Sequence, residues 1–184
     1  MDARHLSAEE LAAGIDEVRG SPAGEGTVEL IVRRPQHGER EVLAEGVLDP
    51  VEGLVGDTWR ARGSRSTPDG SADREVQVTL MNARAAALVA QERERWALAG
   101  DQLYVDLDLS AGNVPPGTRL GVGSAVVEAT AEPHTGCGKF RERFGLEAIR
   151  LLNSPAGQEL RLRGINTKVV EGGTVRQGDT IRKL

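Results

Sequence analysis

The single cysteine of this sequence, Cys137, lies in the segment Pro133–Lys139, after a predicted strand and before a predicted helix. A thiol at a helix N-terminus with basic side chains close by is favoured as the thiolate, the form that attacks carbon or ligates a metal. Gly136 and Gly138 on either side leave room for a ligand to approach the sulfur. A lone cysteine is more often a small buried apolar residue, so a reactive and a structural role both stay open.

His134 lies three residues before Cys137 and is the candidate base for a cysteine-dependent hydrolase or transferase. The alternative for His134 is a polar loop residue bonded to the backbone. Basic residues nearby could gather into a phosphate site, because arginine forks match phosphate geometry. The alternative is that these basic side chains only form the water-exposed face of a helix, as is common. These basic candidates are Lys139, Arg141, Arg143, Arg161, Arg163 and Lys168.

Composition limits the classes of partner. The 184 residues include 23 Lys and Arg against 28 Asp and Glu, a net charge of -5, which argues against a general nucleic-acid or anionic-membrane binder. One cysteine and three histidines exclude an intramolecular disulfide and the usual structural zinc clusters. The acidic start of the chain does not resemble a secretory signal, and no transmembrane stretch is visible. We therefore expect a cytoplasmic protein that binds a cofactor or small-molecule substrate.

The first part of the chain predicts one helix followed by strands. Ser7 and Glu10 have the spacing of a capping box before the apolar periodicity of a helix over residues 7–19. Apolar and polar side chains alternate over residues 28–33, and residues 42–48 form a second such run. This predicts two strands that pair across a turn at His37. The polar, glycine-containing stretch 63–73 is typical of a mobile loop.

The remainder alternates short strands, glycine turns and two helical regions. A strand ends before Asn82, which caps a helix over residues 82–95, and a second helix is predicted over residues 139–152. Residues 103–109 read as a half-buried strand with Tyr104 on its polar face. The pattern predicts a mainly β fold, all-β or α+β, in which a mostly antiparallel barrel carries these helices outside. We expect one domain over residues 1–184, with a helical extension at 1–25 and the barrel at 26–184. Further strands are expected at 118–122, 124–131, 165–170, 174–175 and 180–183.

Short motifs follow one another in a definite order around the lone Cys137. They are Gly53-Leu-Val-Gly-Asp57, Arg74-Glu-Val-Gln-Val-Thr-Leu80, Pro116-Gly-Thr-Arg-Leu-Gly-Val-Gly123, Ala125-Val-Val-Glu-Ala-Thr130 and Val169-Val-Glu-Gly-Gly-Thr-Val-Arg-Gln-Gly-Asp179. Each motif is short, but the order of the set is fairly specific. The set resembles the MOSC domain, named for the C-terminal domain of molybdenum cofactor sulfurases, and the likeness runs from about Val28 to the C-terminus.

The resemblance implies a β-barrel that binds molybdenum cofactor, a molybdenum ion on a pterin (molybdopterin). It implies that Cys137 is the sulfur carrier or the molybdenum ligand, and that Asp57 and Arg74 are the family's acidic and basic site residues. Lys139, Arg141, Arg143 and Arg163 are then candidates for holding the phosphate. Pyridoxal phosphate, a family-level label, belongs to a desulfurase domain that 184 residues cannot hold, so we expect sulfur to come from another protein.

Three functions remain open at the level of sequence. The first is a stand-alone MOSC protein acting as a molybdenum-dependent reductase or as a sulfurtransferase, with a redox partner or a sulfur donor protein. The second is a cofactor-binding module without catalysis. The third is a cysteine-dependent hydrolase or transferase unrelated to molybdenum, with Cys137 and His134 as its catalytic residues.

Overall fold

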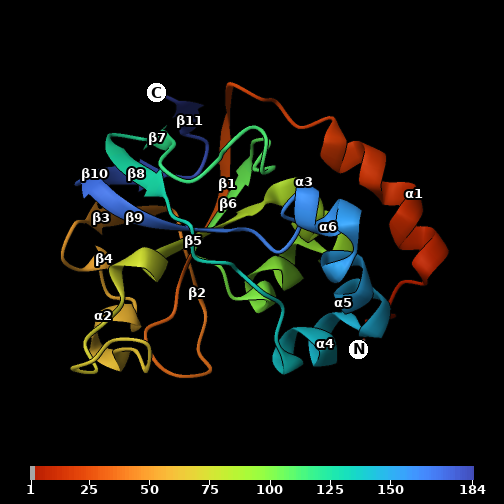
Figure 1. Ribbon diagram of the computed structural model, residues 1–184, viewed down its shortest axis with the longest axis horizontal. Helices are drawn as coiled ribbons and strands as arrows, with labels where there is room; N and C mark the ends of the chain where they lie inside the picture. Colours follow the sequence, from red (N-terminus) through yellow and green to blue (C-terminus); the bar gives the residue numbers. More distant parts are fainter. Residues whose placement is uncertain (1–2) are drawn as a thin grey trace.

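The computed structural model describes residues 3–184, and its centre is a closed barrel of seven strands (Figure 1). Around the barrel the strands follow the order β11-β7-β8-β9-β5-β6-β1, and β1 closes it by pairing with β11. Only the β5–β6 pair is parallel, so the predicted mostly antiparallel barrel is confirmed. The strands are β1 (Glu25–Arg33), β5 (Val78–Asn82), β6 (Leu103–Asp106), β7 (Arg119–Val122), β8 (Ala125–Ala129), β9 (Ile165–Glu171) and β11 (Thr180–Lys183).

A small second sheet adjoins the barrel, in the order β10-β3-β4. Its strands are β3 (Glu45–Asp49), β4 (Gly53–Leu54) and β10 (Gly173–Arg176), while β2 (Glu41–Leu43) extends the barrel sheet beyond β1. The strand predicted over residues 42–48 is therefore two strands in two sheets, and β2 pairs with β1 as expected. Within β3, Gly46 lets the Leu54 side chain of β4 pack closely, because a Cβ there would lie 2.8 Å from Leu54 Cδ1.

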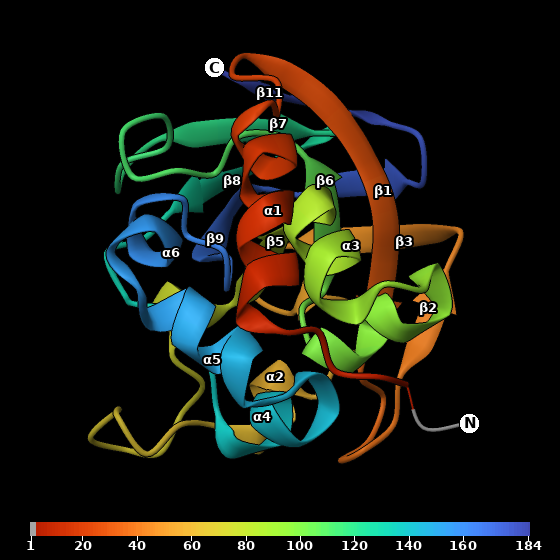
Figure 2. The same cartoon turned by 90° about the vertical axis from the view of Figure 1, so that its right-hand side faces the viewer.

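Most helices cover one side of the barrel, the right-hand side in Figure 1 and the side facing the viewer in Figure 2. The predicted N-terminal helix is confirmed as α1, with the reciprocal Ser7 and Glu10 hydrogen bonds of a capping box. None of the helices within residues 3–184 is long and apolar enough to cross a membrane. The helical elements are α1 (Ala8–Arg19), α2 (Trp59–Arg62), α3 (Ala83–Ala90), α4 (Gly138–Phe144), α5 (Leu146–Asn153), α6 (Pro155–Glu159) and the 3₁₀ helices η1 (Arg74–Val76) and η2 (Arg93–Ala99).

Both long predicted helices are interrupted. The helix expected over 82–95 ends at Ala90, because Gln91 adopts a left-handed backbone with φ of 64°, and η2 follows. The helix expected over 139–152 breaks at Gly145, where φ is 95° and a Cβ would lie 2.8 Å from the His5 ring. The break lets α4 and α5 take separate directions.

Two apolar cores share the central strands. Leu80, Leu103 and Val105 point into the barrel, whereas Met81 and Tyr104 point outward beneath the helices. Tyr104 was expected on a polar face, but it is fully buried and its hydroxyl donates to the Trp96 carbonyl at 2.7 Å. Alternate side chains of β6 therefore point to two different buried faces: one lies in the barrel interior, and helices cover the other.

Asn82 joins the barrel to the helical layer. Its Oδ1 accepts from the amides of Arg84 and Ala85 at the start of α3, as the predicted cap requires. Its Nδ2 donates to Ser21 Oγ at 2.8 Å and to the Leu107 carbonyl at 3.0 Å. All of these bonds are made by a side chain that is 2% exposed.

We predict that Asn82→Ala lowers the free energy of unfolding by about 2–4 kcal/mol, because the helix loses its cap and buried partners lose a donor. Urea denaturation measures this change. The control is Asn153→Ala, at an exposed position, for which we expect a change within about 0.5 kcal/mol. Equal effects of the two substitutions would contradict this role of Asn82.

Candidate functional site

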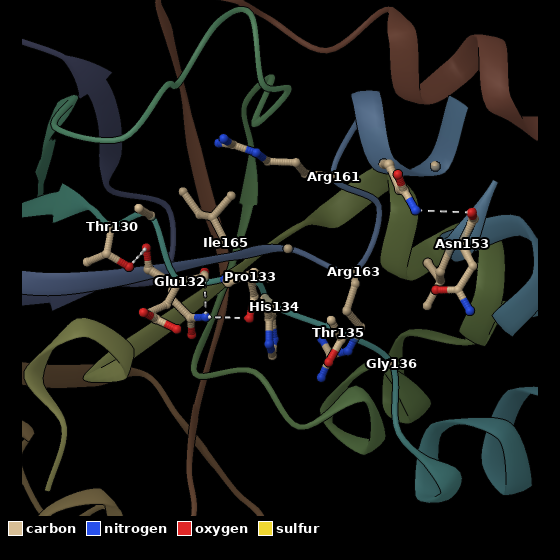
Figure 3. Close-up of a pocket in the computed structure, with 16 residues that line it drawn as sticks. Thr130, Glu132, Pro133, His134, Thr135, Gly136, Asn153, Arg161, Arg163 and Ile165 are labelled. Atoms are coloured by element: carbon tan, nitrogen blue, oxygen red, sulfur yellow. Dashed lines mark hydrogen bonds between the residues drawn. The ribbon is translucent and has the colours of Figure 1, made fainter. Parts of the chain in front are cut away.

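The loop that carries Cys137 is fastened to β9 at its beginning. Thr130 N donates to the Asn166 carbonyl at 3.0 Å, and Asn166 Nδ2 donates to the carbonyls of Glu132 at 3.0 Å and Pro133 at 3.3 Å (Figure 3). The loop ends at Cys137, which is the N-cap residue of α4 and is exposed. Of the two roles that the sequence leaves open for Cys137, the buried apolar one does not fit, because the residue is exposed.

A buried carboxylate holds the middle of this loop. Asp101 is completely buried, and His134 Nε2 lies 2.7 Å from its Oδ1. Arg163 Nη1 donates to the other oxygen of the same carboxylate, and Arg163 Nη2 donates to the Ala99 carbonyl at 2.9 Å. Sequence reasoning found His134 and Arg163 but missed Asp101, which brings them together.

Aromatic side chains enclose this ion pair. The Arg163 guanidinium lies 5.2 Å from the centre of the Phe140 ring, which belongs to α4. The Asp101 amide donates to the Tyr104 hydroxyl at 3.3 Å. Burial alone would raise the pKa of Asp101, but the charges of Arg163 and His134 lower it to about 2. Asp101 is thus a fixed negative charge inside the protein.

A cluster of arginines lies around residues 98–100, just before Asp101, and we call Arg34, Arg40 and Arg143 the basic cluster. Arg34 Nη1 donates to the Gly100 carbonyl at 3.3 Å, and Arg143 Nη1 donates to the Leu98 carbonyl at 2.6 Å. Arg40 is half-buried, and its Nε is buried without a hydrogen-bond partner among residues 3–184. Burial, together with repulsion from Arg143 and Arg34, lowers the pKa of Arg40.

Asp57 is the carboxylate that faces the basic cluster, and it is bound to Arg34. Its oxygens accept from Arg34 Nη2 at 2.8 Å and from Arg34 Nε at 2.9 Å. Burial would raise the pKa of Asp57, but the bonds from Arg34 outweigh this and lower it. This pairing neutralises one arginine, so the basic cluster keeps a positive charge.

The two ends of α4 connect the thiol to the basic cluster. Arg143 lies in its last turn, while Lys139 in its first turn has Nζ 3.5 Å from His37 Nε2. His37 and Arg40 belong to one segment, which contacts Lys139 at the start of the helix and holds Arg40 near enough to Arg143, at its end, for repulsion between the two arginines. Of the predicted basic residues, Lys139 and Arg143 therefore lie near this segment.

Two other predicted residues lie elsewhere. Arg74 Nη2 donates to the Val169 carbonyl at 3.0 Å, and Arg74 lines a hollow with Pro50 and Trp59. Arg141 is exposed, and its side chain makes no hydrogen bond or ion pair within residues 3–184. Sequence reasoning also missed Arg34 and Arg40, which are ordinary charged residues of a strand end and a turn in the sequence.

We predict that Asp101→Asn lowers the free energy of unfolding at neutral pH by about 3–5 kcal/mol, because Arg163 is left buried without its partner. The ordinary pKa of an aspartate is about 3.9. Since the folded-state pKa of Asp101 is about 2, its ionised form contributes stability above the ordinary value, and this contribution is lost as the pH falls toward about 2.

Urea midpoints measured at neutral pH and between about pH 4 and pH 3 test both statements. We expect the wild type to lose stability over the acidic interval more steeply than Asp101→Asn. Asp16→Asn, at an exposed carboxylate, is the control. Identical pH profiles for the wild type and the Asp101 variant would contradict the assignment.

Comparisons with known proteins agree with this architecture. Neither a protein-family model nor a curated protein matches the chain in sequence. Among solved structures, the YuaD protein from Bacillus subtilis matches with a TM-score of 0.58 and 17% identity, over 85% of this chain and 94% of YuaD. YiiM from Escherichia coli matches with a TM-score of 0.55 and 19% identity, over 86% of this chain and 69% of YiiM.

A further solved structure, described as a hypothetical protein, matches with a TM-score of 0.57 and 18% identity, over 91% of this chain and 70% of its own. YuaD and YiiM are stand-alone MOSC-domain proteins. At these identities the likeness concerns the fold, and the fold of this chain is MOSC-like.

Proposed function

We propose that this chain binds molybdenum cofactor, with its anionic group at the basic cluster and the Cys137 thiol as molybdenum ligand or sulfur carrier. One observation carries the proposal: α4 has an exposed thiol at its start and the basic cluster at its end. Its seven residues correspond to about 10 Å of helix. An elongated ligand with a metal at one end and a phosphate at the other would reach both.

The basic cluster fits an oxyanion. Arginine forks match phosphate oxygens, and the buried Nε of Arg40 has no partner within residues 3–184. A bound phosphate would also reduce the repulsion between Arg40 and Arg143. Gly100 lies next to this cluster, since a Cβ there would be in ordinary contact with Arg40 Nη2, at 3.7 Å.

The thiol fits a soft transition metal. Within residues 3–184 no group of three histidine, cysteine or acidic side chains could hold a bare metal ion, so Cys137 would add one ligand to a metal that arrives inside a cofactor. When bound, molybdenum cofactor supplies a metal that exchanges electrons and oxygen or sulfur atoms. The chain then acts as a reductase or sulfurtransferase, and a cofactor-binding module without catalysis would use the same residues.

A cysteine-dependent hydrolase or transferase is the second candidate, and Asp101 favours it. The carboxylate bound to His134 is the orienting group that such a mechanism needs. Against it, no hydrogen bond joins His134 to Cys137 among residues 3–184. The molybdenum proposal needs only that His134 hold the loop in place.

We predict that Arg40→Gln lowers the molybdenum and pterin content of the purified protein about tenfold, a change of about 1.4 kcal/mol in binding free energy. The protein is purified from a host that makes the cofactor, and metal analysis and pterin fluorescence measure the content. Arg19→Gln, at an exposed position on α1, removes the same charge and should leave both values unchanged. A wild-type protein without molybdenum or pterin would contradict the proposal.

We predict that Cys137→Ser abolishes sulfur transfer or molybdenum-linked reduction while leaving much of the pterin binding intact. The reason is that the thiol would contact the metal, whereas other side chains would hold the remainder of the cofactor. His134→Ala should have a smaller effect on activity, since it loosens the loop without removing the sulfur. If the two substitutions were equally damaging in an esterase or amidase assay, and no molybdenum accompanied the active protein, the hydrolase would replace this proposal.

A further inference from the structure

A cavity of about 370 Å³ lies on another side of the loop that leads to Cys137. Its walls are residues 130–136 of that loop, the end of α5 with part of α6, Arg161, and residues 163–166 (Figure 3). Cys137 and the basic cluster are not among its lining residues. The volume falls in the range of cavities that hold small organic molecules.

Arg161 gives this cavity a charge that no acidic group pairs with. Its Nη1 donates to the Val114 carbonyl at 2.6 Å, and within residues 3–184 it forms no ion pair. Burial lowers the pKa of Arg161, and no nearby carboxylate offsets this. The remaining guanidinium donors have no partner in the described part of the chain.

The backbone at Arg161 is held in an unusual conformation. Its φ is 49°, in the left-handed region that non-glycine residues rarely adopt. The turn is fixed by Leu162 N donating to the Gly157 carbonyl at 3.0 Å and Gly164 N donating to the Arg161 carbonyl at 2.8 Å. These bonds hold the turn that places Arg161 in the cavity wall.

The opposite part of the lining is polar but close to neutral. Figure 3 shows Arg161 on one side of Ile165, with His134 and Arg163 on the other. The charge of Arg163 is balanced by Asp101, so the uncompensated cation of the cavity is Arg161. Glu132 is the acidic residue of the lining, and it is exposed to water.

The rest of the wall suits the body of a small organic molecule. Leu152 and Ile165 supply apolar surface, while Asn153 and Gln158 add amides at the end of the helices. A cavity with apolar walls and one unbalanced cation selects a ligand with an apolar body and a negative group. Asn153 and Gln158 could also bond to neutral parts of such a ligand.

We propose that this cavity binds a small organic anion, with a carboxylate or phosphate group at Arg161 and an apolar part against Leu152 and Ile165. The site is separate from the one proposed for the cofactor, because their residues differ. It therefore does not depend on whether the chain binds molybdenum.

Isothermal titration with the purified chain tests the proposal, using benzoate and inorganic phosphate as probes and benzamide as the neutral counterpart of benzoate. We expect benzoate or phosphate to bind, and benzamide to bind at least about tenfold more weakly than benzoate. Tighter binding of benzoate indicates a carboxylate ligand, and tighter binding of phosphate indicates a phosphate ester.

Arg161→Asn should weaken the preferred probe about tenfold or more, because asparagine tolerates the left-handed backbone but carries no charge. Arg161→Lys, which keeps the charge, should retain more of the affinity. Arg19→Gln, which removes a charge at an exposed position on α1, serves as the control. Thermal melting shows whether each variant is folded.

The proposal is overturned if neither anion binds to the folded wild type, or if benzamide binds as well as benzoate and phosphate does not bind. It is also overturned if Arg161→Asn is folded and keeps full affinity, or if Arg19→Gln weakens binding as much as Arg161→Asn does. If Arg161→Asn does not fold, Arg161→Lys and benzamide still test the proposal. Loss of the arginine fork should reduce the affinity of Arg161→Lys for the anion and leave its affinity for benzamide unchanged.

Discussion

The carboxylate of Asp101 holds together the parts from which the candidate site is built. It binds His134 of the cysteine loop and Arg163, which stands just before β9. Arg163 in turn fixes the Ala99 carbonyl and stacks on Phe140 of α4. A buried ion pair is weak evidence for stability, since desolvation offsets the attraction. Here its directional bonds fix the relative position of three chain segments, which apolar packing alone would leave less defined.

The same region also depends on how β5 and β6 are buried. These strands have the barrel interior on one side and helices on the other. The loops at their ends therefore lie where the two apolar cores meet. The turn 99–101 before β6 lies at that junction. Its carbonyls accept from Arg163 and Arg34, so one turn connects the cysteine loop with the basic cluster. A shift of this turn would therefore move both parts of the candidate site together.

The barrel could be predicted from sequence because its signals are local. Short apolar runs between glycine turns act over a few residues, and so does the Ser7–Glu10 pair that caps helix α1 outside the barrel. The site could be predicted only in part, because its contacts are distant along the chain. Asp101 is 33 residues from His134 and 62 from Arg163, and Arg34 is 66 from Gly100. The misassigned face of Tyr104 has a related cause: the helices that cover it lie elsewhere in the sequence, and alternation alone cannot reveal them.

The negative net charge of the chain does not oppose local binding of anions. Many surface arginines are paired with carboxylates, as in Arg33–Glu41 and Arg84–Asp106. Salt screens exposed charges beyond a distance of about 8 Å at physiological ionic strength, so the overall charge of -5 has little effect at a half-buried arginine. Arg40 and Arg161 are half-buried, so water screens them less than it screens a surface charge, and neither forms an ion pair with a carboxylate within residues 3–184. Each therefore carries a desolvation cost that an anion would offset, and this local balance matters more for binding than the sum of charges.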